Sequence, residues 1–271
     1  AHIKPPKQTQ RNAIFKPICP MKPIIDSLSL IQSIRKLTMK IVLIGANGQL
    51  GSDLREALCQ HQVWASARVA LTANYSNEQI LQLDVTQLDA VRDCLNQIQP
   101  DLVLNASAFH RVDDIERDSS QALLLNGHVP HQLALMCRAL DCAFLHVSTD
   151  YVYDGAKQAP YVESDLPNPL SSYGASKLVG EHLLRAAWHK HFIVRTCGLY
   201  GVAGASGKGG NFALKIHLHL VTVARDDIHI FRRKQQLAHI AVARVIARVR
   251  LPRSERINRA VVVGFQAELV Q

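Results

Sequence analysis

Residues 39–51 read Met39-Lys-Ile-Val-Leu-Ile-Gly-Ala-Asn-Gly-Gln-Leu-Gly51, a short apolar run that passes directly into three spaced glycines. The apolar run is typical of a buried parallel strand. Gly45, Gly48 and Gly51 are typical of a turn that opens a helix and brings backbone N–H groups to a phosphate. This context predicts a dinucleotide-binding unit. The spacing differs from the commoner G-x-G-x-x-G, so turn glycines without a ligand are the alternative.

The rest of the chain continues the alternation of strand and helix. Further apolar runs fall at residues 63–67, 80–83, 102–106, 143–148 and 192–195. Apolar residues recur every three or four positions over 88–98, and a longer helical pattern covers 121–140, interrupted or entered at Pro130. Strand–helix alternation with right-handed crossovers predicts an α/β fold, a doubly wound parallel sheet of the Rossmann type.

The net charge of +9 is carried by the two ends of the chain. Residues 1–38 contribute +6 and residues 211–271 contribute +7, whereas residues 39–210 carry −4. Basic flanks without interleaved aromatic residues predict no specific nucleic-acid partner. No apolar run reaches the roughly 20 residues of a membrane span. The six cysteines are scattered without a C-x-x-C pair, as in a reducing cytosol, so a cytoplasmic protein with no membrane partner is expected.

The sequence suggests three parts. Residues 1–38 contain five prolines and no clear apolar period, which predicts a disordered N-terminal extension. Either Met39 is the true start or this segment includes a transit peptide. Residues 39–212 are predicted to form the Rossmann domain with the catalytic residues, and residues 213–271 a partial or altered substrate-binding lobe.

A candidate catalytic group follows the fifth apolar run. Thr149 lies where that strand should end, at the sheet edge that binds ligands in open α/β folds. Tyr173 and Lys177, four residues apart, should share one helix face. A neighbouring ammonium, together with the positive charge of oxidised nicotinamide, stabilises a phenolate and should lower the pKa of Tyr173 toward the working range. Tyr173 could then protonate a carbonyl oxygen held by the Thr149 hydroxyl while a hydride reaches the carbon.

Two further positions bear on the cofactor. Asp84 and Val85 follow the third apolar run, where a carboxylate can accept a hydrogen bond from an adenine amino group. Asp84 could also cap the helix that begins near Leu88. Arg68 follows the second run, where an acid would bind the ribose hydroxyls of NAD, and an arginine there favours the 2′-phosphate of NADPH. NADPH and NADH both remain candidates.

These motifs together resemble the extended short-chain dehydrogenase/reductases, and more closely their dTDP-4-dehydrorhamnose reductase group. The resemblance covers residues 39–212 and rests on the glycine turn, Asn105-Ala-Ser-Ala-Phe109, Ser148-Thr-Asp-Tyr-Val-Tyr-Asp-Gly155, Tyr173-Gly-Ala-Ser-Lys-Leu-Val-Gly-Glu181, Arg195-Thr-Cys-Gly-Leu-Tyr-Gly201 and Gly210-Asn-Phe212. It implies that Thr149, Tyr173 and Lys177 are catalytic and that Asn126 supports the site. The residues expected to bind the cofactor are Gly45, Asn47, Gly48, Gln49, Leu50, Gly51, Arg68, Asp84, Val85, Asn105, Ala106, Ser107, Ala108, Tyr173 and Lys177.

The resemblance implies NADPH- or NADH-dependent reduction of a 4-keto nucleotide-sugar, with a homodimer as a candidate assembly. Nucleotide-sugar 4,6-dehydratases need an Asp-Glu pair after the threonine, but Asp150 is followed by Tyr151 here. After about Ile230 the Asp-Gln and Pro-Thr-Tyr motifs of the group are missing. The alternatives are a non-catalytic dinucleotide-binding regulatory subunit, similar to the methionine adenosyltransferase β subunit, and an inactive gene product.

Overall fold

The computed structural model describes residues 38–199 and 261–263. The predicted N-terminal extension up to Leu37 and nearly all of the predicted C-terminal lobe lie outside these residues. The motif at Gly210-Asn-Phe212 also lies outside them.

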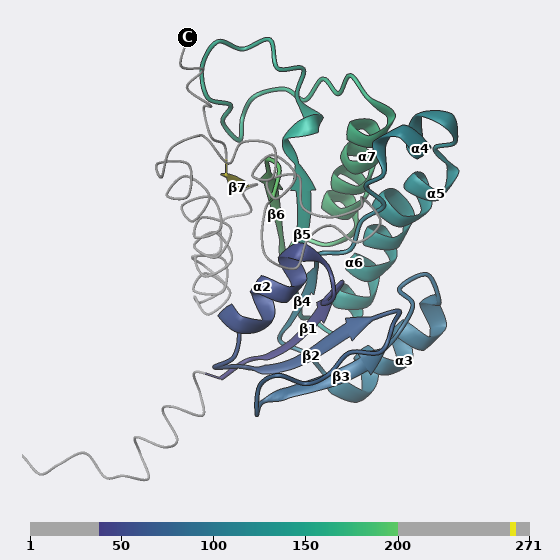
Figure 1. Cartoon of the computed structure of the whole chain (residues 1–271), viewed down its shortest axis with the longest axis vertical. Helices are drawn as coiled ribbons and strands as arrows, with labels where there is room; N and C mark the ends of the chain where they lie inside the picture. The colour runs from purple at the N-terminus through teal and green to yellow at the C-terminus, as the bar shows by residue number, and fades with distance from the viewer. Residues whose placement is uncertain (1–37, 200–260, 264–271) are drawn as a thin grey trace, which may run out of the picture. The chain divides into compact units, whose positions relative to one another are not determined.

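One parallel sheet forms the centre of the described fold (Figure 1). Its strand order is β3-β2-β1-β4-β5-β6-β7, and every neighbouring pair runs parallel. This is the order of a doubly wound dinucleotide-binding sheet, so the predicted fold class is confirmed. The strands are β1 (Lys40–Ile44), β2 (Gln62–Ala67), β3 (Glu78–Gln82), β4 (Leu102–Asn105), β5 (Ala143–Thr149), β6 (His191–Thr196) and β7 (Val261–Val263).

Helices cover both faces of the sheet. The α-helices are α2 (Gln49–Ala57), α3 (Leu88–Ile98), α4 (Val112–Arg117), α5 (Ser120–Ala122), α6 (Val129–Ala139) and α7 (Ser172–Ala187). A π-helical segment, η1 (Leu123–His128), joins α5 to α6, and a single 3-10 turn, η2 (Asp150–Val152), follows β5. Figure 1 shows α2 apart from α3, α6 and α7 across the sheet.

Alternating side chains of the strands build two separate cores. In β1, Ile41 and Leu43 pack with Leu54 of α2 on one face. Val42 and Ile44 point to the other face and pack in the core that α3, α6 and α7 complete. The strands β1, β4, β5 and β6 are buried on both faces, which explains why they read as continuous apolar runs rather than alternating ones.

The predicted helix over 121–140 is one continuous helical run whose π-helical part ends at His128, two residues before Pro130. Proline has no N–H to donate to the carbonyl one turn earlier, which in an α-helix would be that of Asn126. That carbonyl oxygen faces α7 so closely that a Cβ on Gly180 would lie 2.0 Å from it. Pro130 therefore enters the helix with a local change of hydrogen bonding, and Gly180 permits the close contact with α7.

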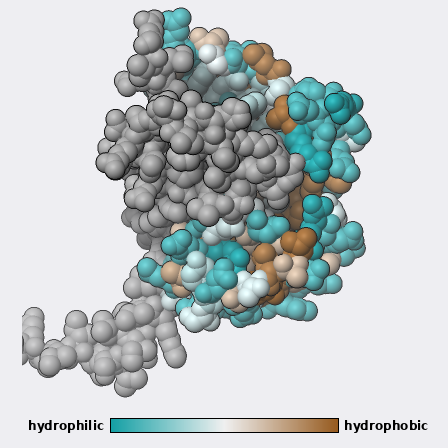
Figure 2. Space-filling model, viewed as in Figure 1, coloured by the Kyte–Doolittle hydropathy of each residue, from teal (hydrophilic) through white to brown (hydrophobic). Residues whose placement is uncertain are grey.

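The seventh strand was not predicted. Val261–Val263 pairs in parallel with β6, with Val194 opposite Val261. Three residues are too short a run for a periodicity argument, and the surrounding Arg/Val/Ala-rich sequence gave no boundary. The described part of the face in Figure 2 is mostly hydrophilic with small hydrophobic areas. No helix among the described residues is long and apolar enough to cross a membrane.

Candidate active site

The glycine turn after β1 is shaped by close backbone contacts. The N–H groups of Gly45 and Ala46 both donate to the Ser66 carbonyl, at 3.0 and 2.9 Å. Gly45 has a φ of 81°, and a Cβ there would lie 2.8 Å from the backbone nitrogen of Ser107. A Cβ on Gly51 would lie 2.1 Å from the Gly45 carbonyl oxygen. A larger residue at Gly51 would push the start of α2 away from the turn, and one at Gly45 would push the turn away from the segment after β4.

The residues at the start of α2 fit a polar, anionic ligand. Gly48 is the N-terminal capping residue, and no side chain caps this helix end. The first N–H groups of a helix have no partner within it, so those at Gln49 and Leu50 are suited to a phosphate. The buried Gln49 Oε1 accepts no hydrogen bond within the described residues, and it suits a ligand hydroxyl or amide. Asn47 is exposed beside this turn.

Arg68 and Asp84 lie at the carboxyl ends of β2 and β3. Asp84 accepts hydrogen bonds from the Thr86 N–H (2.9 Å) and hydroxyl (2.8 Å), and the Thr86 N–H is the main cause of its lowered pKa. The positive charge of exposed Arg68 lowers this pKa further, so the two side chains interact electrostatically. Asp84 therefore stabilises a turn, and the expectation that it caps α3 is wrong because Gln87 occupies the capping position. Val85 is buried.

The segment after β4 is fixed by the buried side chain of Asn105. Its Oδ1 accepts hydrogen bonds from the N–H (3.0 Å) and the hydroxyl (2.6 Å) of Ser107. Its Nδ2 faces His146 Nδ1 at 3.2 Å. Ala106 and Ala108 flank Ser107 and are half-buried. Because Ser107 also contacts Gly45, this segment and the glycine turn form one continuous lining at the carboxyl edge of the sheet.

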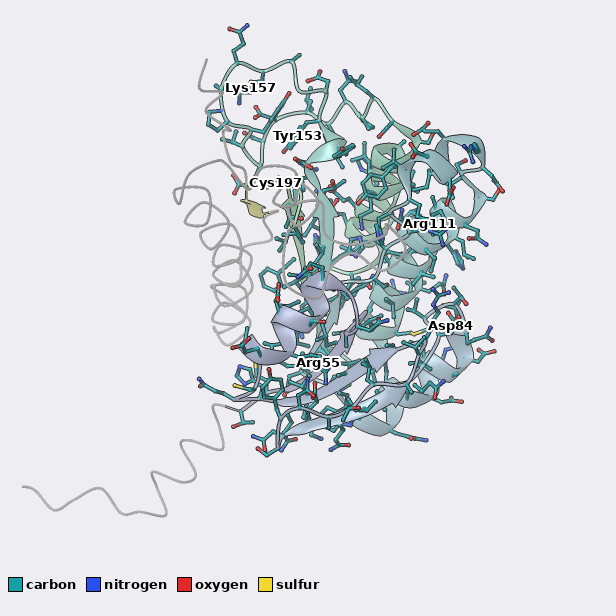
Figure 3. The ribbon with its side chains drawn as sticks, viewed as in Figure 1. Arg55, Asp84, Arg111, Tyr153, Lys157 and Cys197 are labelled. Atoms are coloured by element: carbon teal, nitrogen blue, oxygen red, sulfur yellow. The ribbon has the colours of Figure 1, made fainter. Side chains whose placement is uncertain are left out.

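Two of the three predicted catalytic side chains, Thr149 and Tyr173, meet at the end of β5, and Lys177, one turn further along α7, contacts Val147 of the same strand. Thr149 is the last residue of β5, and Tyr173 lies in the first turn of α7. Figure 3 shows this region with Tyr153 just beyond β5. The Thr149 side chain is hydrogen-bonded to the Tyr173 phenol. A Cβ on Gly174 would lie 2.2 Å from the Tyr151 carbonyl oxygen, so glycine lets α7 begin directly against η2.

The pKa values in this group differ from the expectation. Burial raises the pKa of Tyr173 to about 12, against the Thr149 hydrogen bond, and the nearby Asp150 carboxylate adds to the rise. Burial lowers the pKa of Lys177 to about 8, against the Glu181 carboxylate. Lys177 Nζ donates to the Val147 carbonyl at 2.7 Å and contacts His146 Nε2 at 3.1 Å. In the protein alone the pKa of Tyr173 is thus raised by burial, and Lys177 contributes nothing to lowering it.

Sequence reasoning missed a buried ion pair behind the site. Glu181 lies one turn after Lys177 and accepts two hydrogen bonds from Arg195. Arg195 Nε donates to Oε1 at 2.9 Å, and Arg195 Nη2 donates to Oε2 at 2.6 Å. Ser148 Oγ donates to the same carboxylate at 2.6 Å, and Arg195 Nη1 donates to the Tyr153 hydroxyl at 2.6 Å. Burial alone would raise the pKa of Glu181, but Arg195 overcomes it and the pKa is lowered. Both residues stand in the quoted motifs, although the sequence gives no sign of their pairing.

Asn126 connects η1 with the site. Its Oδ1 accepts from the Phe109 N–H at 2.9 Å, and its Nδ2 donates to the Phe109 carbonyl at 2.9 Å. Nδ2 also donates to Ser176 Oγ at 3.0 Å, and that hydroxyl donates to the Tyr173 carbonyl at 2.8 Å. Asn126 thus connects the segment after β4 to the helix that carries Tyr173 and Lys177.

The family model described as the RmlD substrate binding domain matches residues 39–257. The chain belongs to this family. The match continues past Ile230, where the recognisable motifs end. The resemblance to the dTDP-4-dehydrorhamnose reductase group is thereby confirmed at the level of family.

Curated relatives and solved structures agree with the family. The dTDP-4-dehydrorhamnose reductase of Escherichia coli is 34% identical over 175 residues, which cover 65% of this chain and 54% of that protein. A spore coat polysaccharide biosynthesis protein of Bacillus subtilis is 35% identical over 169 residues, 62% of this chain and 56% of that protein. The chain spans about half the length of the curated relatives it matches.

Two crystal structures of RmlD family members show the same fold. The dTDP-4-dehydrorhamnose reductase of Bacillus anthracis in complex with NADP has a TM-score of 0.55 and 29% identity, covering 68% of this chain and 60% of that chain. An ortholog from Clostridium acetobutylicum has a TM-score of 0.54 and 34% identity, covering 67% of this chain and 59% of that chain.

Proposed function

We propose that the protein reduces the 4-keto group of a nucleotide-sugar, similar to dTDP-4-dehydrorhamnose, with NADPH or NADH as the hydride donor. The main support is the hydrogen bond between the Thr149 and Tyr173 side chains at the end of β5, with Lys177 one turn further along the same helix. Relatives at 34–35% identity carry the name dTDP-4-dehydrorhamnose reductase, and one at 29% identity is crystallised with NADP.

The glycine turn and the segment after β4 are the proposed cofactor site. The N–H groups at the start of α2 would bind the pyrophosphate, and Arg68 would face a ribose 2′-phosphate. A bound reduced nicotinamide would supply the hydride for the carbonyl carbon. The side chains of this chain would bind the cofactor, orient the carbonyl and supply the proton.

Tyr173 is the proposed proton donor. A pKa of about 12 keeps its phenol protonated at neutral pH, so it has a proton to give to the carbonyl oxygen. The phenolate left behind is strongly basic and needs a nearby positive charge. Lys177 on the next turn of α7 would provide that charge when protonated, and Thr149 would hold the carbonyl oxygen in line with the phenol.

A direct test follows the hydride into the product. The full chain is mixed with a dTDP-linked 4-keto-6-deoxy sugar and NADPH carrying deuterium at the transferable position. The proposal expects deuterium at C4 of the product sugar and stoichiometric loss of NADPH. Cofactor binding without any reduced sugar would reject the enzymatic function and favour a dinucleotide-binding subunit.

A further inference from the structure

A row of buried hydrogen bonds connects the segment after β4 to Lys177. The row runs from Ser107 through Asn105 and His146 to Lys177 Nζ, with contacts of 3.0, 3.2 and 3.1 Å. The Asn105, His146 and Lys177 side chains are all almost fully buried. The proposed reaction assigns no role to His146, which lies among apolar residues in β5.

The backbone N–H of Ser107, at one end of this row, determines which atoms donate and which accept along it. The Ser107 backbone N–H can only donate, so the Asn105 atom that it meets must be the carbonyl oxygen. The Asn105 amide group therefore faces His146 Nδ1 and donates to it. Nδ1 must then carry no proton, and the neutral ring carries its proton on Nε2. The buried surroundings of His146 keep its pKa well below the ordinary value, which agrees with a neutral ring.

This tautomer acts on the charge of Lys177. The Nε2–H bond of His146 points at Lys177 Nζ, and an ammonium has no lone pair with which to accept it. An uncharged amine accepts from Nε2–H and still donates to the Val147 carbonyl. We propose that His146 is a positioning residue that, held as the Nε2–H tautomer by Asn105, favours the uncharged amine of Lys177 over the ammonium.

The charged groups around Lys177 have opposite effects on its ammonium. Glu181, one turn along α7, favours it, but its carboxylate already accepts hydrogen bonds from Arg195, Arg185 and Ser148. From β5, His146 presents a donor and Val147 a carbonyl. The phenol of Tyr173 is neutral at pH 7. Of these groups, His146 alone demands that Nζ accept a hydrogen bond.

The consequence, which rests on the proposed function, concerns the reaction's pH range. Reduction needs the Tyr173 proton and the Lys177 positive charge together. An amine that loses its proton near pH 8 makes the rate fall as the pH rises through that value. His146 would thus set the alkaline limit of the reaction through Lys177, without touching the substrate.

The decisive experiment observes the ring nitrogens of His146 in the full chain labelled with ¹⁵N-histidine. Long-range ¹H–¹⁵N correlation distinguishes the two neutral tautomers, and His146→Gln identifies the signals. His191 is a matched control, because its Nδ1 lies 2.5 Å from the Trp188 carbonyl oxygen and must carry the proton. We expect Nε2–H for His146 and Nδ1–H for His191 at about pH 9.5, where neutral rings dominate.

The protonation of Lys177 should change the His146 signals in the same spectra. As the pH is lowered, the His146 shifts should change with a midpoint near 8, and Lys177→Met should abolish this change. The inference would be overturned by an Nδ1–H tautomer or a doubly protonated ring of His146. It would also be overturned if the His146 chemical shifts changed with pH in the same way in wild type and Lys177→Met. None of these observations depends on a reductase activity.

A kinetic readout tests the consequence. In His146→Gln the amide can turn its oxygen toward the ammonium, so the alkaline limit of kcat/KM should move up by about one pH unit. An unmoved limit in a folded, active variant contradicts the role of His146. If the wild-type chain reduces no keto-sugar, the proposed function fails, while the spectra still decide the tautomer.

Discussion

Replacing Arg195 with methionine should destabilise the protein strongly. The guanidinium makes two short hydrogen bonds to the Glu181 carboxylate and one to the Tyr153 hydroxyl, and both charged side chains are at most 2% exposed. Removing one partner of such a pair leaves an uncompensated buried charge, which typically costs about 3–5 kcal/mol of unfolding free energy. Arg185 still reaches Glu181 at 3.0 Å, so we expect the lower end of that range.

Urea unfolding of the full chain, followed by tryptophan fluorescence, measures the effect. The control is Arg92→Met, which removes an arginine from an ion pair with Asp89 whose side chains are 52% and 91% exposed. That change should cost less than about 1 kcal/mol. Adding Glu181→Gln to Arg195→Met removes the buried carboxylate that has lost its main partner and should recover at least about 1 kcal/mol. Equal stability losses in Arg195→Met and Arg92→Met would refute this reasoning.

The pH dependence gives an independent check. The pKa of Glu181 is lowered in the folded protein, so the pair's contribution is present above the ordinary glutamate pKa and is lost as the pH falls through the folded-state value. The stability difference between wild type and Arg195→Met should therefore shrink in acid. A difference that is constant from neutral to acidic pH would show that lost packing, not charge, causes it.

Three further predictions concern the site. Gly51→Ala should weaken NADPH binding at least about tenfold in a fluorescence titration, because its Cβ would lie 2.1 Å from the Gly45 carbonyl oxygen. Arg68→Ala should weaken NADPH binding about tenfold and change NADH binding far less, as measured by calorimetry, because only NADPH has a 2′-phosphate; equal losses would remove Arg68 from cofactor selection. The keto-sugar reduction rate should fall as the pH rises through about 8, where Lys177 loses its charge, while the Tyr173 phenol stays protonated; a rate that rises across this range would contradict the roles of both residues.

The elements carrying the site could be predicted because their signals are local. Apolar runs ending in glycine or a small polar residue mark β1 and β5, and the four-residue spacing of Tyr173 and Lys177 places both on one face of α7. The position of Asn126 followed from the family resemblance. Its bonds to Phe109 and Ser176 give that position a physical reason.

The interactions that tune the site could not be predicted, because they join residues distant in sequence. His146 lies in an apolar strand, where a single histidine reads as an ordinary buried core residue. Only the fold brings it to Lys177. The same holds for Glu181 and Arg195, on different elements. The direction of the Tyr173 pKa shift depends on burial, which a four-residue spacing does not reveal.

The most direct test of the proposed mechanism is the rate of NADPH oxidation by Tyr173→Phe with a dTDP-linked 4-keto sugar. Tyr151→Phe is the matched control, since that ring packs edge-on against Tyr173 at 5.7 Å and its side chain is largely exposed. We expect Tyr173→Phe to lose about 10²–10⁴-fold in rate with unchanged NADPH binding, and Tyr151→Phe to stay near wild type. A Tyr173→Phe variant that turns over at the wild-type rate would contradict the assignment of the proton donor.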